Sequence, residues 1–222
     1  MDVDSQLTPT RRTSLAASAV ESIRQAILCG ELPAGVPVSQ AMLAKKLGTS
    51  QGPVRDAILV LEREGLIRRT STNRMIVVRL TRADIEELIQ IRSVLEVLAV
   101  RLAIERAVPE DLARLDDNIR ATEEAGATEL GVDLDLQFHG ILLEAARNRR
   151  LMSIWRELYP QLSVIMHRAF NSPPHSNLTA ANAHRKLVEL IRGREEARAV
   201  TFVETQMLEL LEWAVKVFDP AS

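Results

Sequence analysis

The chain has 222 residues, 46% of them hydrophobic, which allows one or two domains with a sizeable buried core. A single cysteine excludes an internal disulfide framework, and the lack of a long apolar run or signal peptide argues against a membrane span or export, so we expect a cytoplasmic protein. Residues 1–80 carry 11 Lys and Arg against 7 Asp and Glu, whereas residues 81–222 carry 17 against 23. A polyanionic partner is therefore plausible for the first part only.

The chain begins with an acidic, polar stretch, MDVDSQLTPT, and we expect residues 1–13 to be a disordered tail. A first helix is predicted over residues 15–28, and Gly30 is its expected end. The following ELPAGVPVS segment is predicted to be a connector, in which Ser39 caps the next helix.

The stretch from Leu43 to Leu66 has the pattern of a helix-turn-helix. Gly48 can leave the first helix in a left-handed conformation, and Ser50 is a favourable N-cap for the second. The second helix turns apolar residues to one side and presents a polar N-terminal turn on the other: Ser50, Gln51, Gly52 and Arg55. Such a helix can enter a DNA major groove by its N-terminal end, although a plain pair of core helices would also fit this stretch alone.

The next segment predicts a β-hairpin, because LIRRT and MIVVRL alternate in hydrophobicity around the turn STN. A helix-turn-helix followed by a hairpin is a winged helix, which favours DNA binding. The expected wing carries arginines suited to phosphate or minor-groove contact: Arg68, Arg69, Arg74 and Arg79.

From Thr81, which forms a capping-box pattern with Asp84, the hydrophobic period is helical to the end. Helices are predicted at 82–107, 109–125, 129–147, 149–171, 177–193 and 195–218, with a kink at Pro160 in the fourth. The expected fold is mainly α: a winged helix-turn-helix domain at 14–80, followed at 81–222 by an antiparallel all-α bundle of about six helices for effector binding and dimerisation.

Segments of both parts resemble known families. GELPAG, LAKKLGTSQGPVRDAILVLEREGLI and NRMIVV closely resemble the winged-helix domain of the GntR family of bacterial transcription regulators. IEELIQIRSVLEVLAVRLA, DLQFHGILLEAARN and AHRKLVELIRG resemble the helical effector domain of its FadR subfamily. The likeness covers about residues 15–215, and six helices place the chain nearest the VanR-like branch. It implies a homodimer that binds palindromic double-stranded DNA.

The resemblance also implies the DNA contacts. Arg55 matches an arginine that the family uses for base and phosphate contact, whereas Gln51 and Gly52 stand where arginine and threonine are usual. Because arginine reads guanine and glutamine pairs with adenine, the operator is expected to differ from the usual one. Ser50 and Arg74 complete the expected DNA-binding set, and Met75 replaces a wing-tip glycine of the family.

Two histidines lie on inward-facing stripes of the predicted bundle. Asp135 and His139 are four residues apart on one helix, and His184 shares a face with apolar residues of another. A lone inward histidine is more often a satisfied core residue than a ligand. The resemblance implies that these three hold a divalent ion, zinc or nickel, while a fourth ligand, a histidine of the last helix, is replaced here by Gln206 or Thr205. Binding should then be weak, and a metal-free polar cavity stays open as the alternative.

Arg92 is also predicted to point into the bundle. It can pair with Glu96 on the same helix or hold the carboxylate of a ligand, as the matching arginine does in the family. Arg92 and Gln206 are therefore the expected effector-binding residues. Three other residues are interpreted as ordinary packing or loop residues: Trp155, His167 and His175.

Three functions are compatible with these patterns. The leading one is a ligand-responsive regulator, in which a small organic acid shifts the population between DNA-competent and incompetent arrangements. The second is a metal-dependent enzyme in a helical bundle, and the third a DNA-binding protein whose helical domain only dimerises. An enzyme is not expected, because no further glutamate or nucleophile accompanies the metal ligands in a recognisable motif and the winged helix would be unexplained.

Overall fold

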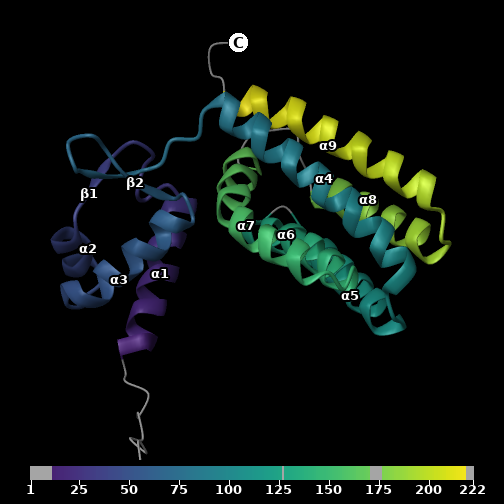
Figure 1. Cartoon of the computed structure of the whole chain (residues 1–222), viewed down its shortest axis with the longest axis horizontal. Coiled ribbons are helices and arrows are strands. Elements are labelled where there is room, and N and C mark those ends of the chain that lie inside the picture. Colours follow the sequence, from purple (N-terminus) through teal and green to yellow (C-terminus); the bar gives the residue numbers. More distant parts are fainter. Residues whose placement is uncertain (1–11, 127, 171–176, 219–222) are drawn as a thin grey trace, which may run out of the picture. The chain divides into compact units, whose positions relative to one another are not determined.

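The computed structural model describes residues 12–126, 128–170 and 177–218, and the chain divides into two compact units between Arg79 and Leu80. The first unit contains α1 (Arg12–Leu28), β1 (Pro37–Val38), α2 (Gln40–Lys46), α3 (Gln51–Arg63), β2 (Ile67–Arg69) and β3 (Met75–Val77) (Figure 1). The predicted winged helix-turn-helix is confirmed. Helix α1 begins three residues earlier than predicted, so the end of the expected tail is helical, and the rest of that tail lies outside the described residues.

The small sheet has one strand more than the sequence predicted. Its order is β1-β3-β2, and Pro37 and Val38 of the expected connector pair antiparallel with Ile76 and Met75. Two residues are too few to show an alternating pattern, so the strand depends on the edge that β3 offers it. The hairpin formed by β2 and β3 is present as predicted.

Buried apolar side chains hold α3 in place within the first unit. Val54, Ala57 and Leu61 are fully buried, and they occupy the inward face that the sequence predicted. The Ser39 hydroxyl accepts a hydrogen bond from the Met42 N–H at 3.1 Å and so caps α2. Ser50 is the N-cap of α3 by backbone position, but among the described residues its side chain makes no capping hydrogen bond.

The second unit is a bundle of α4 (Arg82–Arg106), α5 (Pro109–Ala125), α6 (Glu129–Ala145), α7 (Arg149–Phe170), α8 (Asn177–Arg192) and α9 (Glu196–Phe218). Their bounds lie within a few residues of the prediction. The Thr81 capping box is present, since Thr81 and Asp84 exchange backbone-to-side-chain hydrogen bonds of 3.2 and 2.7 Å. Helix α7 continues through Pro160 as one helix.

Helix α4 contacts several other helices of the bundle. It packs alongside α9 and against α6 and α7 (Figure 1). The core around it is apolar except for a group of buried polar side chains, in which Arg92 and Glu96 are each 1% exposed. None of the described helices has the length and hydropathy that a membrane span requires.

Candidate effector and DNA-binding sites

A cavity of about 140 Å³ opens inside the bundle, and every effector and metal residue predicted from the sequence lines it. These residues come from four helices: Arg92 of α4, Asp135 and His139 of α6, His184 of α8, and Gln206 of α9. Apolar side chains such as Leu187 and Phe202 make up much of the remaining wall. A mostly apolar cavity with a few convergent polar groups is the usual form of a small-molecule site.

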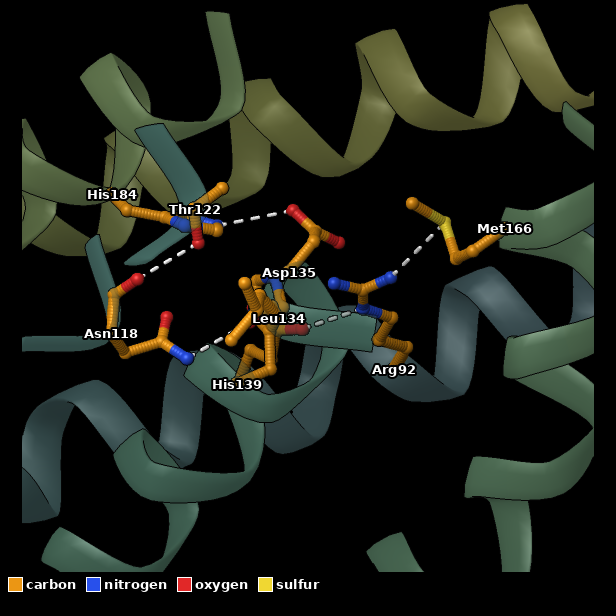
Figure 2. Close-up of polar contacts among 9 residues, drawn as sticks. Arg92, Asn118, Thr122, Leu134, Asp135, His139, Met166 and His184 are labelled. Atoms are coloured by element: carbon orange, nitrogen blue, oxygen red, sulfur yellow. Dashed lines mark hydrogen bonds and ion pairs between the residues drawn. The ribbon is translucent and has the colours of Figure 1, made fainter. Parts of the chain in front are cut away.

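Asp135, His139 and His184 form a compact cluster. Their candidate ligand atoms all lie within 4.8 Å of one another, and the His184 Nε2 is 3.4 Å from the Asp135 Oδ1 (Figure 2). The other carboxylate oxygen of Asp135 and the Nδ1 of His184 are buried and have no hydrogen-bond partner among the described residues. A buried set of one carboxylate and two imidazoles with unused lone pairs suits a divalent ion such as zinc or nickel, so the cluster can hold a metal.

The protonation state of His184 also suits a residue that coordinates a metal ion. Burial lowers the pKa of its imidazole to about 3, and the nearby Asp135 carboxylate offsets only part of that effect. The ring is therefore neutral near pH 7, which is the form that donates a lone pair to a metal. Phe138 stacks on this ring with centroids 3.8 Å apart and an interplanar angle of 5°, which fixes its orientation.

Glu96 is the site residue whose role sequence reasoning missed. Arg92 donates from Nε to the Glu96 Oε1 at 2.6 Å, so the ion pair weighed as an alternative role for Arg92 exists. The other oxygen, Oε2, lies 2.9 Å from the Nδ1 of His139. Burial would raise the pKa of Glu96, but His139 and Arg92 beside it lower that pKa to about 2. An ionised carboxylate thus joins the candidate effector anchor to a candidate metal ligand.

Arg92 has further N–H donors besides the Nε that bonds to Glu96. Its Nη1 lies 3.8 Å from the Met166 sulfur (Figure 2). Its guanidinium carbon is 5.9 Å from the centre of the Trp155 ring. A thioether is a weak acceptor, so a ligand carboxylate can take its place. Trp155, interpreted as a packing residue, is buried behind the site.

Of the two positions considered for the last-helix ligand, Gln206 faces the cavity and Thr205 is exposed. The Gln206 amide donates to the Glu209 carboxylate at 2.9 Å, and Glu209 lines the same cavity. The Thr205 hydroxyl instead donates to the Thr201 carbonyl at 2.9 Å. His167 is buried against Ser163 away from the cavity lining, and His175 lies outside the described residues.

The residues predicted to contact DNA lie at the surface of the first unit. Ser50, Gln51, Arg55 and Arg74 are exposed and Gly52 is half-buried, so the N-terminal turn of α3 is open to a partner. Asn73 adopts a left-handed conformation with φ 58°, which asparagine tolerates, at the tip of the wing. Met75, which stands where the family has a wing-tip glycine, belongs to β3.

Two family models match this chain in the same order as the two units. The model for bacterial regulatory proteins of the gntR family matches residues 15–77, and the FCD domain model matches residues 87–208. The chain belongs to the GntR family of bacterial regulatory proteins. Its second unit is an FCD domain, which confirms the resemblance to FadR-type effector domains.

Similar proteins agree with this assignment. The chain is 30% identical over 185 residues to the HTH-type transcriptional regulator YdhC of Bacillus subtilis, covering 80% of each chain. It is 31% identical over 184 residues to a probable D-xylose utilization operon repressor of Paenarthrobacter nicotinovorans, covering 82% of this chain and 80% of that one. It is 26% identical over 167 residues to the gluconate operon repressor of Bacillus subtilis, covering 72% and 68%.

The fold is shared with a solved regulator. E. coli McbR/YncC superposes with a TM-score of 0.70 at 19% identity, covering 88% of this chain and 94% of the other. The relatives identified by sequence are transcription regulators and not enzymes, and this GntR-family chain is a transcription regulator, as expected.

Proposed function

We propose that this GntR-family regulator binds palindromic operator DNA as a homodimer in the cytoplasm and responds to a small carboxylate effector held in the FCD cavity with a divalent metal ion. The observation that carries the proposal is the convergence of Arg92 with Asp135, His139 and His184 on one buried cavity. The winged helix supplies the DNA-binding surface, through Ser50, Gln51, Gly52, Arg55 and Arg74.

The charge inside the cavity supports a role for the metal. Among the described lining residues, the carboxylates of Glu96, Asp135 and Glu209 outnumber the single cation, Arg92. Glu96 already balances Arg92, so an anion entering the metal-free cavity would meet net negative charge. A divalent ion bound by Asp135, His139 and His184 would offset that charge and would act as a Lewis acid toward a carboxylate.

The chain's own residues then position the ligand. The free N–H groups of Arg92 hold one carboxylate, Glu96 fixes the orientation of His139, and Gln206 with Glu209 offers polar contacts to the far end of the effector. The similar protein named for a gluconate operon is consistent with an acid as ligand.

Coupling to DNA follows from the place of α4. This helix carries Arg92 and Glu96 and follows β3 of the wing directly in the chain. An effector that favours one placement of α4 over another would shift the population of DNA-competent dimers by its differential affinity. Repression and activation are both compatible with this mechanism.

A binding experiment tests the proposal. Operator fragments selected from a random pool would be titrated with protein that has been stripped of metal by a chelator, or reloaded with zinc or nickel, with and without a panel of small mono- and dicarboxylates. We expect at least one carboxylate to change operator affinity, and to do so more strongly with the metal-loaded protein. The same carboxylate should have no effect on Arg92→Ala. An effect that is identical without metal would remove the metal from the proposal.

A further inference from the structure

The effector cavity has a buried end and an open end, and polar side chains line both. The polar lining that is buried consists of Glu96 and the residues proposed above for the carboxylate and the metal: Arg92, Asp135, His139 and His184 (Figure 2). The remaining polar lining comes from α9, where Gln206 is half-buried and Glu209 is exposed. Because Glu209 lines the cavity and is also open to solvent, it marks the open end.

A hydrogen bond between these two α9 residues fixes the orientation of the Gln206 amide. The Gln206 Nε2 donates to the Glu209 Oε2 at 2.9 Å. A carboxylate has no hydrogen to donate, so the amide nitrogen is the atom of Gln206 that must face Glu209. The amide oxygen, Oε1, is then directed away from Glu209, and no donor bonds to it among the residues that the structure describes.

The open end of the cavity therefore offers mainly hydrogen-bond acceptors. These are the Gln206 Oε1 and the second carboxylate oxygen of Glu209, against one remaining N–H of the Gln206 amide. The only cation in the described lining is Arg92, which Glu96 already pairs. A ligand group that donates a hydrogen bond would be stabilised at this end, whereas a second carboxylate would meet the negative charge of Glu209.

We propose that Gln206 and Glu209 form a donor-selective subsite, so that the effector is a short monocarboxylate with a hydroxyl or ammonium group at its far end. The Gln206 Oε1 accepts a hydrogen bond from that group. Glu209 acts as a positioning residue that holds the amide nitrogen, and its second oxygen accepts a further hydrogen bond. The inference rests on the proposed function, because the carboxylate of the effector is taken to lie with the metal and Arg92 at the buried end.

This arrangement predicts how the site rejects other acids. A cavity of about 140 Å³ admits only a short chain, so the far end of the ligand lies close to the α9 residues that line it. An unsubstituted acid would displace water from the Gln206 oxygen and supply no donor in its place. A dicarboxylic acid of the same length would place like charges side by side at Glu209.

Calorimetric titration of the full chain in the presence of zinc tests the proposal. Short straight-chain acids of several lengths would be compared, each as the unsubstituted acid, the terminal hydroxy acid, the terminal amino acid and the dicarboxylic acid. The donor is placed at the terminal carbon because a hydroxyl beside the carboxylate could instead bind the metal. At the best-fitting length we expect a hydroxy or amino acid to bind about tenfold more tightly than the other two acids. The tighter of these two identifies the donor.

Three variants of α9 show whether the preference comes from the subsite. Gln206→Met replaces the acceptor with an apolar side chain of similar length and should remove the preference. Glu209→Gln keeps the size but removes the charge, so it should reduce the preference and improve binding of the dicarboxylic acid. Glu204→Gln is the matched control, because Glu204 is an exposed carboxylate of the same helix that does not line the cavity, and it should keep the preference. Binding of the unsubstituted acid shows that each variant is folded.

The possible failures are distinguishable. If acids bind without any preference for a terminal donor, or if the preference survives in Gln206→Met, the subsite is wrong and the proposed carboxylate effector stands. If no acid of any series binds to the protein with zinc, the proposed function is contradicted and the subsite with it.

Discussion

Gln51 and Arg55 are one turn apart on the exposed side of α3, where the N-terminal end of a recognition helix meets DNA. Neither side chain contributes to the core, since the inward face of α3 belongs to residues such as Val54 and Ile58. Substitutions at these two positions should therefore change DNA binding without changing the fold.

Arg55→Ala should strongly weaken specific operator binding, because loss of one base or phosphate contact of an arginine costs about 1–3 kcal/mol. Gel shifts at fixed salt would measure the effect, and circular dichroism would check the fold. Unchanged affinity in a folded variant would remove Arg55 from the DNA-binding surface.

Gln51→Arg tests which base the helix reads. A glutamine pairs with adenine and an arginine with guanine, so the variant should prefer guanine at one symmetric position in each half-site. Sequences selected from a random pool by the two proteins would show the change. Identical preferences would mean that Gln51 contacts no base edge.

Gln206→His tests the cavity at the position where the family's last ligand is missing. The imidazole would replace a neutral amide beside three donors that already converge, so metal retention after dialysis should increase. Elemental analysis after dialysis would compare the metal content of the wild type, Gln206→His and His139→Ala. If His139→Ala kept as much metal as the wild type, the metal site would lie elsewhere.

At the scale of elements, regular periodicity predicted nearly the whole fold. The six bundle helices and the hairpin appear where apolar spacing and caps such as Thr81 and Asp84 placed them, because these signals are local. Strand β1 was missed because it exists only by pairing with β3. Helical spacing also predicted which side chains point into the bundle: Arg92, Asp135, His139 and His184. It could not predict the contact of Glu96 with His139, because that contact joins α4 to α6 and depends on how the two helices pack.

The packing of α4, α6 and α8 around this polar cluster should make the metal-free protein sensitive to acid. The folded-state pKa of His184 is about 3, below its ordinary value near 6.5, so between these values the unfolded chain binds more protons and unfolding is favoured as the pH falls. The pKa of Glu96 in the folded protein is about 2, so this residue adds to the loss of stability as the pH falls below 4.5. Between its folded and unfolded pKa values, His184 alone changes the free energy of unfolding by at most about 1.4 kcal/mol per pH unit.

Thermal unfolding of chelator-treated protein from pH 7 to pH 4 would measure this dependence. The melting temperature of the bundle should fall with pH, and His184→Gln should show a shallower slope because its side chain binds no proton. Equal slopes for the two proteins would contradict the assignment of the buried neutral imidazole.

At the scale of the whole molecule, effector and operator are expected to influence each other through α4, and thermodynamics requires that influence to be reciprocal. If a carboxylate changes operator affinity by a given factor, operator DNA must change carboxylate affinity by the same factor. Gel shifts with and without effector would give the change in operator affinity. Calorimetric titration of metal-loaded protein with the effector, both free and saturated with operator, would give the change in carboxylate affinity. We expect a factor of about 5 to 150, the usual range of allosteric coupling. An effector that binds equally well to free and operator-bound protein would show that the helical unit dimerises without transmitting a signal.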